Sequence, residues 1–167
     1  MPEMIPQLGK QTYAPPTQAV ILELHRLVCI FLASKSFADL RQGPTYRIDT
    51  WDHLQESEES EISRILLTVA ITARVIDDLH QNPFAFIGGS CGVLEDGQGE
   101  KPLSMRDAMN KIIHATSIHF DVDQNEEGQQ YVNPTIYLYG DKNGSRWKAT
   151  MDVLEFAQKY VACIRHF

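Results

Sequence analysis

Apolar residues recur every three or four positions from Thr17 onward, which is the spacing of a helix with one buried face. Thr17 follows two prolines directly and suits the N-cap of this helix. A second apolar stripe of the same period predicts a helix that starts near Ser57 or Ser60 and ends near His80. Three acidic residues at its start, which suit the positive end of a helix dipole, support this prediction: Glu58, Glu59 and Glu61.

The pattern changes period in the C-terminal half of the chain. Residues 104–107 form a capping box that opens a third helix, which extends to about residue 115. Residues 118–122 and 136–139 alternate between apolar and polar side chains, as half-buried strands do. Asn143-Gly144 then predicts a hairpin into a further strand, and a second capping box at residues 152–155 starts the last helix.

These elements predict an α+β fold that is predominantly α, with about four helices in a bundle and a small antiparallel sheet before the C-terminal helix. Residues 1–16 contain four prolines and are interpreted as an extended leader, and residues 17–167 as a single domain. Residues 40–54 have no clean period and are interpreted as a connection with one short strand or turn. The five glycines in residues 83–102 favour a long loop that folds back onto the core.

Composition narrows the class of protein. The 167 residues include 22 acidic and 15 basic side chains, so the net charge is −7, and 43% of the residues are hydrophobic. A chain of this size buries a core without disulfides, and the three cysteines, which form no C-x-x-C pair, suit a reduced, cytoplasmic protein. No apolar run approaches the length of about 18 residues that a membrane span requires. The acidic balance disfavours nucleic-acid binding through bulk charge but leaves room for a local basic pocket.

The most suggestive candidate site lies on the third predicted helix. Arg106, Asn110 and His114 are spaced four residues apart and therefore share one face, with Lys111 beside them. On such a face an arginine binds a phosphate, an asparagine orients it, and a histidine serves as general acid or base. The alternative is that Asn110 and His114 only cap backbone groups near the end of the helix.

The sequence from Asn110 to Ala115 resembles the motif of the HEPN superfamily, in which an Arg-Asn dipeptide is followed after three residues by His. Asn110 and His114 match, whereas Met109 stands where the arginine is expected and Arg106 lies one turn earlier. The resemblance implies a helical bundle that dimerises and cleaves RNA without a cofactor. In that chemistry His114 acts on the 2′-hydroxyl or the leaving oxygen, and Arg106 stabilises phosphate charge in a site shared by two protomers.

A different function class is suggested by residues 52–61, which contain five carboxylates and neither Lys nor Arg. This run is either a charged helix start that faces water or a docking surface for a basic partner. In the second case Glu58, Glu59 and Glu61 would bind the partner, as in an antitoxin or immunity protein. An accessory interaction domain without catalysis is the third alternative. For a homodimer, apolar residues of the 83–102 segment could supply the interface, although packing of the segment within its own chain explains them equally well: Phe84, Phe86 and Ile87.

A metal site is a weaker candidate. His114, His119, Asp121 and Asp123 are potential ligands within ten residues, but alternating polar residues on a half-exposed strand produce the same pattern. Residues 121–128 begin like a calcium loop, yet the position that needs glycine holds Glu126. We therefore interpret this segment as a solvated acidic turn and predict no bound metal.

Overall fold

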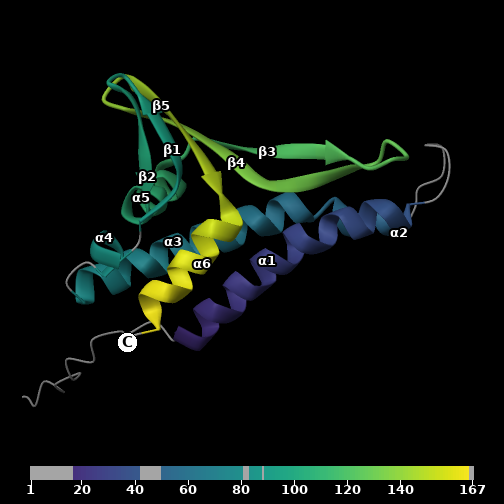
Figure 1. Ribbon diagram of the computed structural model, residues 1–167, viewed down its shortest axis with the longest axis horizontal. Coiled ribbons are helices and arrows are strands. Elements are labelled where there is room, and N and C mark those ends of the chain that lie inside the picture. Colours follow the sequence, from purple (N-terminus) through teal and green to yellow (C-terminus); the bar gives the residue numbers. More distant parts are fainter. Residues whose placement is uncertain (1–16, 42–49, 81–82, 88, 166–167) are drawn as a thin grey trace, which may run out of the picture.

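The computed structural model describes residues 17–41, 50–80, 83–87 and 89–165 (Figure 1). Its helices are α1 (Thr17–Leu40), α2 (Thr50–Gln55), α3 (Glu58–Leu79), α4 (Pro83–Ile87), α5 (Met105–His114) and α6 (Val153–Ile164). Its strands are β1 (Ser90–Asp96), β2 (Gly99–Ser104), β3 (Ser117–Gln124), β4 (Gln130–Lys142) and β5 (Ser145–Asp152). The fold is therefore α+β with more helix than strand, as the sequence predicts.

The five strands form one antiparallel sheet in the order β2-β1-β5-β4-β3. β1 pairs with β2, β3 with β4, and β4 with β5, each pair consecutive in the chain, whereas β1 also pairs with the much later β5. This pairing places the first hairpin beside the last strand. α5, which connects β2 to β3 along the chain, lies below β1 and β2 in Figure 1.

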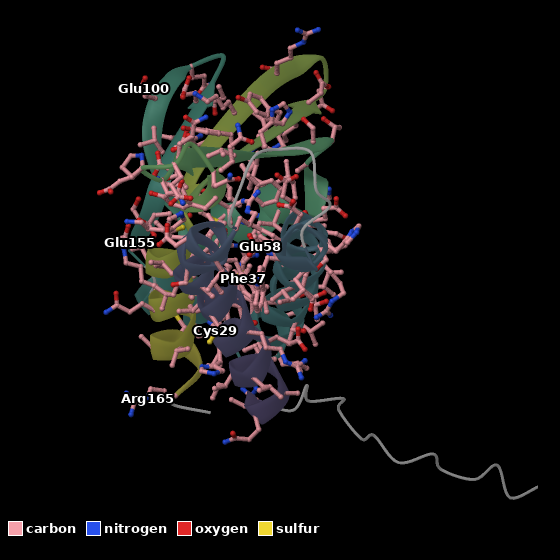
Figure 2. The ribbon with its side chains drawn as sticks, turned by 90° about the vertical axis from the view of Figure 1, so that its right-hand side faces the viewer. Cys29, Phe37, Glu58, Glu100, Glu155 and Arg165 are labelled. Atoms are coloured by element: carbon pink, nitrogen blue, oxygen red, sulfur yellow. The ribbon has the colours of Figure 1, made fainter. Side chains whose placement is uncertain are left out.

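The helices cover one face of the sheet. In β4 and β5 the buried side chains all have the same parity, and they face the helices: Val132, Ile136, Leu138, Trp147, Ala149 and Met151. Figure 2 shows the separation of the layers, with Glu100 of β2 at the top and Arg165, just after α6, at the bottom. The intervening side chains of the strands therefore point to the opposite, open face.

One hydrophobic cluster joins the helices to the sheet. Tyr160 of α6 is fully buried at its centre, where its ring centroid lies 5.0 Å from that of Phe84 and 5.9 Å from that of Phe156. The Tyr160 hydroxyl donates a hydrogen bond of 2.9 Å to the backbone oxygen of Val69 in α3. This bond satisfies the polar end of an otherwise apolar side chain.

The predicted caps and hairpin turn are present. Ser104 accepts a hydrogen bond of 3.1 Å from the backbone N–H of Asp107, and Asp152 accepts one of 2.8 Å from that of Glu155. Asn143 and Gly144 have φ values of 55° and 79°, as a two-residue type I′ turn between Lys142 and Ser145 requires.

The expectation of a long loop over residues 83–102 is wrong. This segment contains α4, β1 and most of β2. Gly92 indicated a loop by composition, yet it lies within β1, where a Cβ atom would come 2.0 Å from the backbone oxygen of Thr150 in β5. Glycine is needed there because the two backbones approach closely. With β1 and β2 added, the sheet has five strands rather than the three that the sequence indicated.

The structure decides two further expectations. Part of the predicted 40–54 connection is the short helix α2, while residues 42–49 lie outside the described residues. For Phe84 the sequence left an interface and packing within the chain open, and the structure shows the second, because Phe84 is 1% exposed and packs in the core. The helices form a layer against the sheet, with α1 and α3 side by side in Figure 1.

Within the described ranges, no helix combines the length and the apolar character that crossing a bilayer requires.

Candidate functional site at the α5–hairpin pocket

The local sequence of α5 separates a buried side from a polar side. Ser104 and Asp107 fix the start of the helix, and four side chains then face the core: Met105, Ala108, Met109 and Ile112. The polar candidates lie on the remaining surface, with His114 exposed at the C-terminal end and Asn110 and Lys111 partly buried. Met109, at the position where the motif has an arginine, is fully buried, and its side chain carries no charge.

Arg106 does not join the other candidates. Its guanidinium donates a hydrogen bond to Asp77 of α3, whose side chain is fully buried. The other carboxylate oxygen of Asp77 accepts a hydrogen bond of 3.2 Å from the backbone N–H of Phe84. Arg106 thus ties α5 to α3 and α4, and the sequence could not show this because the partner carboxylate lies 29 residues away.

Asn110, Lys111 and His114 line one pocket of about 540 Å³ between α5 and the β4–β5 hairpin. The hairpin contributes Lys142, Asn143 and Trp147, and two carboxylates complete the lining: Asp107 and Asp141. The pocket therefore holds two ammonium groups and an imidazole, with one carboxylate near each ammonium group along the chain. Its chemistry suits a ligand that carries negative charge together with groups that accept hydrogen bonds.

Trp147 positions Lys111 in this pocket. The Lys111 ammonium lies 4.0 Å from the centroid of the Trp147 ring, which is itself 5% exposed. Desolvation of this partly buried amine lowers the pKa of Lys111, and Asp107 opposes that effect. The cation–π contact therefore holds a partly dehydrated ammonium in place, where it interacts more strongly with an incoming anion than a fully hydrated one does.

Gly140 allows the indole of Trp147 to occupy this position. Gly140 lies opposite Trp147 in the β4–β5 pair, and a Cβ atom on Gly140 would lie 2.2 Å from Cζ2 of the indole. The ring thus packs across the glycine backbone on one strand while Lys111 packs against the ring. Sequence reasoning missed Lys142, Asn143 and Trp147, although the Asn143-Gly144 turn signalled the hairpin that carries them.

The carboxylates of residues 52–61 have different environments. Glu58, expected as a docking residue, is 7% exposed and accepts a hydrogen bond of 2.6 Å from Ser34 of α1. Figure 2 labels Glu58 beside α1. Burial raises the pKa of Glu58. Glu61 pairs with Arg64 at 2.7 Å, which lowers the pKa of Glu61, whereas Glu59 remains exposed. Glu58 is therefore held against α1 by Ser34, and of the three glutamates Glu59 is the exposed one.

The weaker metal candidates do not converge. Within the described ranges, no three His, Cys, Asp or Glu side chains are arranged to hold a metal ion. The ring of His119 instead packs against Tyr139, and Asp123 accepts a hydrogen bond of 2.9 Å from Asn133. In the acidic turn, Asn125 caps the backbone N–H groups of residues 127 and 129.

The chain matches no protein-family model, no curated protein and no solved structure.

Proposed function

We propose that this protein is a HEPN-like domain that binds RNA in the α5–hairpin pocket and cleaves it without a metal ion. The observation that carries the proposal is the convergence of Asn110, Lys111 and His114 with Lys142 of the hairpin around one pocket. Each group has a role in phosphodiester chemistry: ammonium groups bind phosphate, an amide orients it, and an imidazole transfers protons near neutral pH.

In the proposed reaction the imidazole of His114 accepts the proton of a ribose 2′-hydroxyl. The 2′-oxygen then bonds to the adjacent phosphorus, the bond from phosphorus to the 5′-oxygen breaks, and that oxygen takes a proton from water or from the imidazolium. The products are a 2′,3′-cyclic phosphate and a 5′-hydroxyl. Lys111 stabilises the charge that develops on the phosphoryl oxygens, the role first expected of Arg106.

The test is incubation of full-length protein with labelled RNA in excess chelator, resolved on a denaturing gel. We expect cleavage by the wild type, loss of cleavage in His114→Ala, and a rate about 10²-fold lower in Lys111→Met, in line with removal of one group that stabilises transition-state charge. His53→Ala removes another exposed helical histidine and serves as the matched control. Intact RNA with the wild type, or equal cleavage by His114→Ala, would refute the proposal.

A second candidate function is binding of a basic protein partner. It is supported by the exposed carboxylates near the C-terminal end of α1 and the β3–β4 turn: Asp39, Glu56, Glu59, Glu126 and Glu127. Such a surface accelerates association with an oppositely charged protein. RNA that stays intact and unbound with every variant would favour this function over the first.

A further inference from the structure

The open face of the sheet carries aromatic and basic side chains from three adjacent strands. In β4, Tyr137 and Tyr139 have the parity opposite to that of the buried positions and so point away from the helices. His119 of β3 lies opposite Tyr137, and Lys148 of β5 lies opposite Tyr139. Residues directly opposite each other in an antiparallel pair share a face, so all four side chains lie on the open side.

Contacts between these side chains confirm that they form one surface. The His119 and Tyr139 ring centroids are 5.1 Å apart at an interplanar angle of 63°. The Lys148 ammonium lies 5.5 Å from the centroid of the Tyr137 ring. His119 is exposed and the two tyrosines are half-buried by their neighbours in the sheet, so ring surface remains open to a ligand.

The charge of this surface differs from that of the whole chain. Lys148 forms an ion pair of 3.0 Å with Glu95 of β1, which offsets that carboxylate. Arg146, two residues before Lys148 on the same side of β5, is exposed. Arg146 lies opposite Asp141 of β4, so cations and carboxylates balance around Tyr137 and Tyr139 in a protein with a net charge of −7.

The aromatic surface continues toward the α5–hairpin pocket. A hollow of about 270 Å³ beside it is lined by Tyr139, Arg146, Lys148, Glu95 and Asp96, and also by Trp147. Trp147 in addition lines the pocket that contains His114. The aromatic surface and the proposed reaction site therefore adjoin at Trp147.

We propose that the open face of the sheet binds single-stranded RNA, whose bases stack on Tyr137 and Tyr139 while Arg146 and Lys148 contact its phosphates. The choice of RNA rests on the proposed function. Stacking requires unpaired bases, because paired bases in a duplex already stack on one another. The inference therefore identifies single-stranded RNA as the substrate class of the His114 pocket.

The test is fluorescence anisotropy of the full-length protein with a labelled 12-nucleotide RNA in chelator, with a duplex of the same sequence for comparison. We expect Tyr137→Leu and Tyr139→Leu each to weaken binding roughly 5- to 100-fold, the effect of losing one stacked base. Tyr131→Leu makes the same change six residues away on β4 and should bind as the wild type does. Arg146→Gln should reduce the slope of log K against log salt by about 0.7.

Separate readouts distinguish this inference from the proposed function. His114→Ala should bind RNA like the wild type yet not cleave it, whereas the tyrosine variants should raise KM without changing kcat. Unaltered affinity in Tyr137→Leu and Tyr139→Leu, or a duplex bound as tightly as the single strand, would overturn the stacking surface even if cleavage through His114 stands. Loss of affinity in these variants would support it even if no RNA is cleaved.

Discussion

The ion pair between Arg106 and Asp77 predicts that substitution of Arg106 lowers stability, whereas the resemblance to the HEPN motif predicts that it lowers catalysis. Substitution of Arg106 by Met keeps the length of the side chain and its packing but leaves the Asp77 carboxylate, which is fully buried, without this guanidinium. Removal of one partner from a buried ion pair costs about 3–5 kcal/mol of folding free energy. The Arg106 side chain is 34% exposed, and water partly screens such a pair, so we expect a loss of about 2–3 kcal/mol.

The assay is urea unfolding followed by circular dichroism, together with thermal unfolding. For a domain of this size, the expected loss corresponds to a decrease in Tm of about 5–10 °C. Combination of Arg106→Met with Asp77→Asn should cost less than the sum of the two single changes, by about 0.5–3 kcal/mol, because the two side chains interact directly. Arg26→Met, at an exposed arginine in a surface pair with Glu23, should change stability by less than about 1 kcal/mol.

Two results would refute this reasoning. One is an Arg106→Met protein that unfolds at the same urea concentration as the wild type. The other is additivity of the Arg106 and Asp77 changes, which would show that the two side chains do not interact. If Arg106→Met keeps full stability but no longer cleaves RNA, the catalytic role predicted from the motif is the correct one.

Two further changes test the site and its surroundings. Burial raises the pKa of Glu58 in the folded protein, so the free energy of unfolding of the wild type should fall relative to that of Glu58→Gln as pH rises from about 4 to 7. Urea unfolding of both proteins measures this difference, and equal urea midpoints at every pH would contradict the prediction. In Gly140→Ala the new methyl group must displace the Trp147 indole, so we expect the free energy of unfolding to decrease by about 1–3 kcal/mol. The near-ultraviolet circular dichroism spectrum should also change, and an unchanged spectrum would argue against the packing of Lys111 on Trp147.

The four longer helices, α1, α3, α5 and α6, could be predicted from sequence because each buries one face. The apolar spacing of α1 and α3 and the capping residues of α5 and α6 are local signals, and the structure places these elements close to where the sequence indicates. The hairpin between β4 and β5 was equally local, since Asn143-Gly144 suits both positive φ values of its turn.

The β1–β2 hairpin could not be predicted from local pattern. Its stability depends on pairing between β1 and β5, which are about fifty residues apart in sequence. The buried residues on these strands are few, since β2 exposes most of its side chains to solvent. Glycines that permit close backbone approach, such as Gly92, look in the sequence like glycines of a loop.

The candidate site was predictable only in part, for a similar reason. The spacing of Asn110 and His114 placed both on one side of α5, and the structure brings both to one pocket. The same spacing included Arg106, whose direction is decided by Asp77 on another helix. Lys142 and Trp147 enter the site through the hairpin, and helical spacing carries no information about them.

Both proposed surfaces depend on the register of the β4–β5 hairpin. Side chains alternate along β5, so Trp147 faces the α5 pocket while Arg146 and Lys148 face the open side. A slip of one residue would exchange these faces, moving the indole away from Lys111 and turning two cations toward the core. The two-residue turn at Asn143-Gly144 fixes the pairing of Lys142 with Ser145 and hence every pair that follows. The Asn143-Gly144 turn therefore determines which side chains of β5 face α5 and which face solvent.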